Sequence, residues 1–284
     1  MVIGFIGCGK VGFSLGKYFS LKGITLSGYY SKFYKDAIEA SEFTSSKAYE
    51  NINDLVQDSS MIFITTPDDS IHEVLQKLST LNLTNKIICH TSGSLTSSIF
   101  LDINNSDAFA YSIHPIFPFS DKYNSYKNLQ NAHFSIEGPE YYIHELKDFI
   151  RSLGNKSFTI NKEDKALYHL ANVTVSNLVL SLINTGCSYL SQCGISENDA
   201  LQALLPLIQN NIDNIKTKGF ISALTGPIER NDLNTVKQHM GAAPIGDIQI
   251  YKNLSLKLLA LSEKKHIDKD YNKLKEYLIM QEDN

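Results

Sequence analysis

One stretch of the chain places four polar side chains at helical spacing. Counted from Lys165, the others stand four, seven and eleven positions further on, at His169, Asn172 and Ser176. At about 100° per residue, these side chains share one face of a helix. A lysine on such a face can protonate a carbonyl oxygen that gains negative charge, and its cation stabilises that charge. The stripe therefore predicts a polar cleft with Lys165 as proton donor and with His169 and Asn172 among the substrate-binding residues.

The same stripe can also be interpreted as the solvent side of an amphipathic helix. Its neighbours are strongly apolar, among them Leu167, Leu170 and Val173, so we expect the other faces of this helix to be buried. Asn and Ser are weaker helix formers than Lys, Glu or Gln, so a merely solvated face gives little reason to use them repeatedly. An unpaired buried polar group costs about 1–3 kcal/mol. We therefore favour a stripe that lines a cleft.

More polar side chains stand directly after apolar runs that we expect to be buried strands. Thr66 and Pro67 follow one such run, Ser92 follows another, and His114 ends a third. Because parallel strands present their carboxyl ends at one edge of a sheet, we expect Thr66 and Pro67 to flank a nucleotide, and Ser92 and His114 to reach a substrate. A histidine at a strand end is as often structural as catalytic, and this alternative stays open for His90 and His114.

The amino-terminal segment carries the most specific motif. An apolar run at 2–6 leads into Gly-x-Gly-x-x-Gly at 7–12, and a helical pattern follows. In this context Gly7 permits a tight turn, Gly9 lets the backbone approach a pyrophosphate, and Gly12 lets helix and strand pack closely. The helix N-terminus then offers free N–H groups to the phosphates. The cofactor-binding residues of this turn are predicted to be Gly7, Cys8, Gly9, Lys10, Val11 and Gly12.

The end of the second expected strand bears on which dinucleotide binds. An NAD site usually places an acid there, where it hydrogen-bonds the ribose 2′-hydroxyl. This strand instead ends at Tyr30, Ser31 and Lys32 follow, and no acid stands before Asp36. Because a hydroxyl and a cation suit a 2′-phosphate, we expect NADP, with Ser31 and Lys32 at the phosphate. The alternative is a solvated loop that happens to carry lysines.

Strands and helices alternate over the first part of the chain. We expect strands, after the first one, at 24–30, 61–65, 86–90, 111–114, 133–137 and 156–160. This alternation predicts an α/β domain with a doubly wound parallel sheet. From 162 onward every pattern is helical, with one long helix expected at 162–192. We therefore expect a nucleotide-binding domain over 1–161 and an all-helical domain over 162–284.

Composition narrows the class of protein. The 284 residues carry a formal net charge of −4, which gives no electrostatic reason to expect nucleic acid or an anionic membrane as partner. The four cysteines lack C-x-x-C spacing, so we expect reduced thiols.

We expect no metal, because His90, His114 and His133 lack an acidic or cysteine partner at ligand spacing. The stretch 171–190 is interrupted by Asn, Ser and Thr, so we expect a buried helix there and not a membrane span. The reduced thiols and the lack of a signal-peptide pattern lead us to expect a cytoplasmic protein.

A loop late in the chain places Arg230 shortly after a Gly-Pro turn at 226–227. A guanidinium there can clamp a substrate carboxylate in bidentate fashion. Equally, Arg230 can pair with a local acid such as Glu229. Both interpretations stay open on the sequence.

Taken in order along the chain, these motifs resemble a known family, the Rossmann-like NADP oxidoreductases related to ketopantoate reductase and pyrroline-5-carboxylate reductase. The residues that carry the resemblance are the glycine motif, His-Thr-Ser-Gly-Ser at 90–94, Ser-Ile-His-Pro at 112–115, Lys165 with Tyr168 and His169, Ser176 with Asn177, and Leu-Thr-Gly-Pro at 224–227 with Arg230 and Asp232. The resemblance implies an N-terminal Rossmann domain, a C-terminal helical domain of the 6-phosphogluconate-dehydrogenase type, an active site between them and a homodimer formed through the helices.

The resemblance also bears on the substrate. Ketopantoate reductases carry a lysine on the first helix of the second domain and asparagines on later turns, which Lys165 and Asn172 match. His169 and the pair His90 and His114 depart from that pattern. Some members of this group are thought to serve as an alternative 2-dehydropantoate 2-reductase.

We therefore expect an NADPH-dependent reductase of a small 2-oxo acid, foremost ketopantoate, reduced to pantoate in pantothenate biosynthesis. Lys165 is the expected catalytic residue, and the expected substrate-binding residues are Ser92, His114, His169, Asn172 and Arg230. One alternative is an imine reductase of the pyrroline-5-carboxylate type, which needs no lysine to protonate an alkoxide. Another is a module that senses NADP without catalysis, which has no need of a polar substrate cleft.

Overall fold

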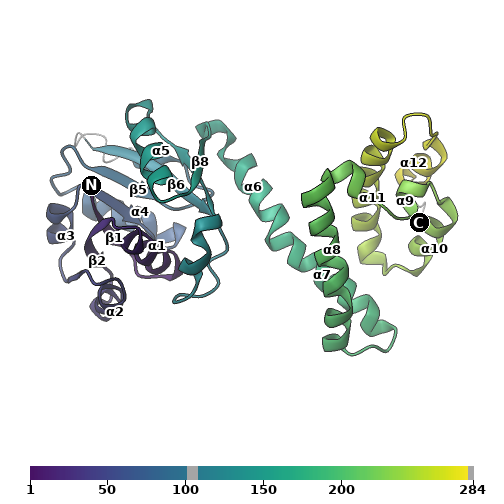
Figure 1. Ribbon diagram of the computed structural model, residues 1–284, viewed down its shortest axis with the longest axis horizontal. Coiled ribbons are helices and arrows are strands. Elements are labelled where there is room, and N and C mark those ends of the chain that lie inside the picture. The colour runs from purple at the N-terminus through teal and green to yellow at the C-terminus, as the bar shows by residue number, and fades with distance from the viewer. Residues whose placement is uncertain (101–107, 281–284) are drawn as a thin grey trace. The chain divides into compact units, whose positions relative to one another are not determined.

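The computed structural model describes residues 1–100 and 108–280 (Figure 1). The chain forms two compact units, Met1–Leu180 and Ser181–Asn284, and each is described by itself. Unit 1 holds the sheet and the first helix after it. Unit 2 is helical throughout its described part.

Unit 1 is built on a single sheet, with the strand order β3-β2-β1-β4-β5-β6-β7-β8. The strands are β1 (Val2–Ile6), β2 (Thr25–Tyr30), β3 (Lys47–Tyr49), β4 (Met61–Ile64), β5 (Ile87–His90), β6 (Phe109–Ile116), β7 (His133–Glu137) and β8 (Lys156–Thr159). The strand order reverses between β1 and β4, which is the switch point where doubly wound sheets bind ligands. The predicted fold class, a mostly parallel Rossmann-like sheet followed by a helical part, is confirmed.

Helices cover both faces of this sheet, because its central strands bury both of their faces. In β4, Met61 and Phe63 join one apolar cluster, whereas Ile62 and Ile64 join the other. The first cluster includes side chains of α1 (Lys10–Leu21), α2 (Tyr34–Thr44) and α5 (Ile143–Ser152). The second includes side chains of α3 (Ile52–Asp58) and α4 (Asp68–Leu78).

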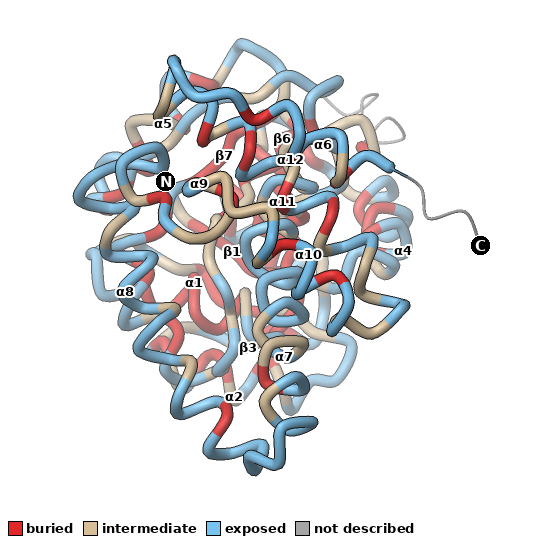
Figure 2. The backbone as a smooth tube through the Cα atoms, turned by 90° about the vertical axis from the view of Figure 1, so that its right-hand side faces the viewer, coloured by how far each residue is buried: buried red, intermediate tan, exposed pale blue. Residues whose placement is uncertain are grey.

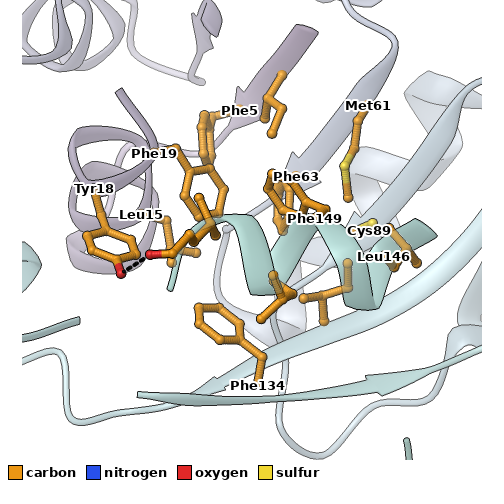
Figure 3. Packing of buried hydrophobic residues seen from close by; sticks show 14 of the residues in the cluster. Phe5, Leu15, Tyr18, Phe19, Met61, Phe63, Cys89, Phe134, Leu146 and Phe149 are labelled. Carbon is orange, nitrogen blue, oxygen red and sulfur yellow. Dashed lines mark hydrogen bonds between the residues drawn. The ribbon is translucent and has the colours of Figure 1, made fainter. Parts of the chain in front are cut away.

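Aromatic rings form the centre of the first cluster (Figure 3). The Phe5 ring stacks on Tyr29 at 5.1 Å and on Phe63 at 5.6 Å between centroids. Phe19 of α1 meets Phe149 of α5 edge to face at 5.4 Å. Phe19 also packs on Phe5 at 6.0 Å between centroids, which holds α1 on β1, and the position of α1 determines where the glycine turn between them lies.

Two predictions about the sheet need correction. The sequence analysis expected a parallel sheet, but β7 runs antiparallel to β6, and β8 runs parallel to β7. The 16 residues between β6 and β7 form only a 3₁₀ segment at Ser125–Asn131, whereas the connection between parallel strands usually contains an α-helix. The short strand β3 and the helix α3 were missed, because both are too short to show a clear hydrophobic period.

The single helix expected over 162–192 is interrupted. The structure has a 3₁₀ turn at Lys162–Asp164, then α6 (Lys165–Val175) and α7 (Asn177–Gln192). Between them Ser176 leaves helical geometry, with φ −114° and ψ −80°. Its hydroxyl donates to the carbonyl of Asn172 at 2.7 Å, and such bonds to the preceding turn often bend helices.

The prediction that the apolar faces of this segment are buried is wrong for the chain alone. Leu167, Val175 and Leu180 are 69%, 74% and 68% exposed. By length and composition only, Lys162–Gln192 could also cross a membrane, and its most apolar window has no buried residue. Lys165 is the one buried residue of α6, so this helix faces the sheet with a lysine and not with its leucines and valines.

Unit 2 contains the rest of α7 and the helices α8 (Glu197–Ala223), α9 (Pro227–Arg230), α10 (Leu233–Ala242), α11 (Ile245–Lys265) and α12 (Asn272–Ile279). Its core is small and comprises Ile228, Val236, Leu259, Tyr271, Leu274 and Leu278. Helix α8 contributes no residue to this core and is exposed along most of its length (Figure 2). Gly219, with φ +73°, interrupts the helical geometry of α8 near its end.

Candidate functional site

The three glycines of the turn between β1 and α1 have different surroundings. Gly7 has φ +105°, and its N–H donates to the carbonyl of Tyr30 at 2.9 Å. A side chain on Gly12 would overlap the Gly7 carbonyl and the Thr65 hydroxyl. A Cβ on Gly9, in contrast, would meet no atom of the described chain within 4 Å. The fold therefore requires Gly7 and Gly12, whereas Gly9 borders open space at the N-terminus of α1.

A cavity of about 340 Å³ lies beside this turn, at the carboxyl ends of β1, β2 and β4. Most residues predicted to bind the cofactor line it together, namely Gly7, Cys8, Gly9, Ser31, Lys32, Thr66 and Pro67. Lys10 and Val11 begin α1 outside this lining. The hydroxyl of Thr66 is buried without a hydrogen-bond partner among the described residues. Such an orphaned polar atom beside a cavity fits a site that takes a polar ligand.

Helix α4 brings to the same cavity two charged residues that were not predicted from the sequence. Lys77 and Glu73 both line it, and their side chains form an ion pair at 3.0 Å. The spacing of Glu73 and Lys77 predicts that they share one face of a helix, but it does not predict that this face lies beside the end of β2. Burial raises the pKa of the Cys8 thiol to about 12, so Cys8 remains a neutral thiol.

The Ser92 hydroxyl is engaged within the protein. It donates to Asp68 Oδ2 at 2.7 Å and accepts the backbone N–H groups of Ser94 at 3.1 Å and Leu95 at 3.0 Å. Asp68 directly follows Pro67, which lines the cavity. These bonds join the end of β5 to the start of α4.

His90 has the structural role that the sequence analysis left open. Its Nδ1 accepts the backbone N–H of Ser92 at 3.2 Å, so its Nε2 carries the hydrogen and donates to the carbonyl of Thr96 at 3.2 Å. The ring stacks on Phe100 at 5.5 Å. Burial lowers the pKa of His90 to about 4, although its bond to Thr96 opposes the shift. A neutral His90 therefore holds the turn after β5.

Lys165 lies at the start of α6 and is 1% exposed. Its ammonium Nζ donates to Ser112 Oγ on β6 at 2.6 Å, and this hydroxyl donates to the Ser92 carbonyl at 3.3 Å. Burial lowers the pKa of Lys165 to about 8, while the carboxylates of Glu137 and Asp68 oppose the shift. Ser112 was not among the predicted site residues, because a serine in mid-strand has no distinguishing pattern.

Two further polar side chains of α6 meet the ends of β5 and β6. The Tyr168 hydroxyl lies 2.5 Å from His114 Nδ1. A Cβ on Gly93 would stand 2.9 Å from His114 Nε2 and 2.9 Å from His169 Cδ2, so both rings border Gly93. Burial, followed by the nearby cation of Lys165, lowers the pKa of His114 to about 4. The structure therefore brings Lys165, His114 and His169 together, as the predicted site requires.

Two other predicted residues, Asn172 and Arg230, have partners of their own. Asn172 donates to the carbonyl of Tyr168 at 2.9 Å, within its own helix. Arg230 belongs to unit 2, where its side chain is 60% exposed and its guanidinium lies 4.0 Å from the Asp232 carboxylate. The local acid beside Arg230 is therefore Asp232 and not Glu229, which binds Lys265 and His266. The part of Arg230 in substrate binding stays a prediction.

The cysteines Cys8, Cys89, Cys187 and Cys193 are free. Over the described ranges 1–100 and 108–280, no three His, Cys, Asp or Glu side chains gather as metal ligands. The expectation of no metal stays a prediction.

Two family models match the chain. The model described as a Rossmann-like domain matches residues 1–115, and the model described as a domain of unknown function, DUF2520, matches residues 132–258. No curated protein matches the chain. The Rossmann-like match covers the glycine turn, the cavity and Ser112, whereas the second match includes α6 with Lys165, Tyr168 and His169.

Several solved structures share the fold over almost the whole chain. Protein TM1727 from Thermotoga maritima is 25% identical, with a TM-score of 0.75 over 93% of this chain and 99% of that chain. A candidate NADP oxidoreductase from Bacteroides fragilis, BF3122, is 20% identical, with a TM-score of 0.69 over 91% and 98%. A Plasmodium falciparum pyrroline carboxylate reductase with NADP bound is 14% identical, with a TM-score of 0.61 over 92% and 98%. The chain thus has the fold of proteins described as NADP-dependent oxidoreductases.

Buried His90 makes the stability of unit 1 depend on pH. Its pKa is about 4 in the fold, below the ordinary 6.5. The unfolded chain binds a proton as the pH falls through 6.5, whereas the folded chain does not bind it until about pH 4. The free energy of unfolding therefore decreases between those values. We expect this group to account for a loss on the order of 2 kcal/mol between pH 7 and pH 5.

Urea denaturation at both pH values, with the wild type and His90→Asn, checks this expectation. The variant should lose less stability than the wild type on going from pH 7 to pH 5. His72→Asn, at an exposed position of α4, should behave as the wild type does. Equal losses in all three proteins would contradict the assignment of His90.

Proposed function

We propose that this chain is an NADPH-dependent reductase that converts the carbonyl group of a small 2-oxo acid to a hydroxyl, with Lys165 as proton donor. The observation that carries the proposal is the buried Lys165 ammonium, held by Ser112 of β6 beside His90, the last residue of β5, because Rossmann-like sheets bind ligands at the carboxyl ends of their strands. A buried lysine whose pKa is lowered to about 8 is typical of a functional site.

Hydrogen bonds connect Lys165 with the cavity beside the glycine turn. Lys165 donates to Ser112, and Ser112 donates to the carbonyl of Ser92. The Ser92 hydroxyl donates to Asp68, and the residue before Asp68 in the chain, Pro67, lines the cavity. A series of hydrogen bonds within unit 1 therefore links the proposed proton donor to the wall of the cavity.

The cavity residues fit NADP(H) as the cofactor. Gly9 has no neighbour where a side chain would stand, which leaves space for a pyrophosphate at the N-terminus of α1. Ser31 and Lys32 offer a hydroxyl and a cation for the 2′-phosphate, and Lys77 adds a second cation to the same lining. When bound, NADPH supplies the hydride that the reaction needs.

Lys165 supplies the proton that the reaction needs. As a carbonyl becomes an alkoxide, its oxygen becomes strongly basic and takes a proton from Lys165 Nζ. Ser112 fixes the direction of Nζ, and the carboxylates of Asp68 and Glu137 favour the charged form of the lysine. Solvent then returns a proton to the amine after each turnover.

Within this reaction type we propose ketopantoate as the substrate, on the match of Lys165 and Asn172 to the ketopantoate reductase pattern. Reduction of a cyclic imine is the second candidate, because a pyrroline carboxylate reductase shares the fold over 92% of this chain. A protonated imine would meet the Lys165 cation, which repels it, whereas a 2-oxo acid would meet an attractive charge.

Replacement of Lys165 separates the role of the proton donor from that of the fold. Lys165→Met should lower kcat by about 10²–10⁴-fold, because it removes the general acid. In the wild type, kcat/KM should fall as the pH rises through about 8, where Lys165 loses its proton. Lys162→Met, at an exposed site one turn earlier, is the matched control and should keep normal turnover.

The measurement is NADPH oxidation with ketopantoate, 2-oxoisovalerate and 1-pyrroline-5-carboxylate. Turnover of the imine alone would favour the imine reductase, and no oxidation with any of the three would favour an NADP-binding module without catalysis. Near-normal turnover of a 2-oxo acid by Lys165→Met would exclude this lysine as proton donor.

Gly9 gives a test of cofactor binding that leaves the fold intact. Gly9 has φ −75° and ψ −173°, which alanine adopts readily, and its Cβ would meet nothing. Gly9→Ala should therefore keep the free energy of unfolding within about 0.5 kcal/mol. The Kd for NADPH should rise about tenfold or more, because the methyl group occupies the approach of the pyrophosphate.

Calorimetric titration with NADPH measures this Kd. Gly241→Ala in α10, where a Cβ also meets nothing, is the control and should leave the Kd unchanged. An unchanged Kd for Gly9→Ala would mean that the turn does not hold the pyrophosphate.

We also propose that a second copy of the chain covers the exposed apolar side chains of α8. Leu201, Leu205, Ile212 and Ile215 lie exposed on one face of this helix, which contributes nothing to the core of unit 2. Exposed apolar patches of this kind usually mark an interface. The expectation of a cytoplasmic protein with no nucleic-acid or membrane partner stays a prediction.

Sedimentation velocity tests the second copy. The wild type should sediment as a dimer at micromolar concentration, and Ile212→Glu should shift the mass to that of a monomer, because a buried charge without a partner opposes association. Ile267→Glu, in the loop after α11, should remain dimeric. A monomeric wild type at all concentrations would rule out this assembly.

A further inference from the structure

Tyr168 and His114 form a close pair that the mechanism above does not use. The Tyr168 hydroxyl on α6 lies 2.5 Å from His114 Nδ1 on β6, and the two rings meet edge to face at 5.7 Å. Both side chains are partly buried. Such a short contact between a phenol and an imidazole is a hydrogen bond whose direction determines the tautomer of the histidine.

The chemistry of the two groups sets that direction. Burial lowers the pKa of His114 to about 4 and raises that of Tyr168, so both are neutral at pH 7. A neutral imidazole nitrogen is a far stronger base than a phenol oxygen, and a phenol is the stronger acid of the two. The Tyr168 hydroxyl therefore donates to Nδ1, which leaves the hydrogen of His114 on Nε2.

Ser135 supports the same direction. It stands opposite His114 in the pairing of β6 with β7, and its buried hydroxyl has no partner within hydrogen-bond distance among the described residues. Burial raises the pKa of Tyr168, and the nearby side chains of Ser135 and Asn172 partly offset this rise. The Ser135 hydroxyl is thus available to donate toward the Tyr168 oxygen, whose own hydrogen points to His114.

The Nε2–H of His114 lies beside Gly93. A Cβ placed on Gly93 would stand 2.9 Å from this nitrogen, so a side chain at this position would press against the imidazole ring. No acceptor for Nε2 is found among the described residues. The charged and titratable groups around the ring are Lys165 and His169 of α6, Asp68 of α4 and His90 of β5.

We propose that Tyr168 is a positioning residue that fixes His114 as the Nε2–H tautomer, so that His114 donates a hydrogen bond to an oxygen of the substrate. Together with the Lys165 ammonium, the site then presents two donors. Such a pair selects a substrate with acceptor oxygens, such as a carbonyl beside a carboxylate, over a protonated imine. The identity of the acceptor rests on the proposed function, whereas the tautomer does not.

The tautomer can be measured without any substrate. Two-bond proton–nitrogen correlation spectra of protein labelled with ¹⁵N-histidine distinguish the two tautomers, and His114→Gln assigns the signal. At pH 7 we expect an unprotonated Nδ1 and a protonated Nε2 in the wild type. Tyr168→Phe should shift the signal toward the other tautomer, whereas Tyr18→Phe, which removes a buried hydroxyl bonded to Asn155, should not.

Turnover supplies the second readout. With a 2-oxo acid substrate, Tyr168→Phe should lower kcat/KM about 10-fold to 100-fold, the effect of one hydrogen bond to a group that gains charge. The basic pKa of the pH profile, which belongs to Lys165, should remain near its wild-type position.

A wild-type His114 protonated on Nδ1 would overturn the proposal, even if Tyr168→Phe did not fold. An unchanged tautomer or an unchanged kcat/KM in a folded Tyr168→Phe would overturn it as well. If the tautomer is as expected but no 2-oxo acid is reduced, the proposed function fails while the positioning role of Tyr168 remains.

Discussion

The site depends on how the fold accommodates one buried ammonium group, that of Lys165. Removal of such a charge from water costs several kcal/mol unless it is compensated. The compensation comes from Ser112, which accepts at 2.6 Å, and from the carboxylates of Glu137 and Asp68. Because these groups stand on β6, β7 and α4, the lysine joins three elements of unit 1. Its lowered pKa is the electrostatic consequence of that position.

The part of the site that could be predicted from sequence is the part with a fixed local geometry. Gly7 and Gly12 are needed by the turn itself, since each would bring a Cβ against neighbouring backbone. A motif of this kind is readable because its residues lie close together in the chain. The helical spacing of Lys165 and His169 is readable for the same reason, and both do reach the end of the sheet.

What could not be predicted depends on contacts between distant segments. The bonds between Ser92 and Asp68 and between Tyr168 and His114 join residues 24 and 54 positions apart. The burial of α6 failed as a prediction because apolar composition does not reveal which partner covers a helix. Here Lys165 is the residue of α6 that is buried, whereas Leu167 and Val175 remain exposed. The antiparallel direction of β7 could not be predicted either, because the hydrophobic pattern of a strand is the same in both directions.

The direction in which α6 crosses the sheet has a mechanical consequence. Lys165 meets β6 at Ser112, and three residues later Tyr168 meets it two positions further on, at His114. The helix therefore advances along this strand, with both contacts on one side of its axis. A twist of α6 about that axis would withdraw the amine and the phenol in a single movement. The bonds of Lys165 and Tyr168 to β6 therefore form together when this helix packs on the sheet.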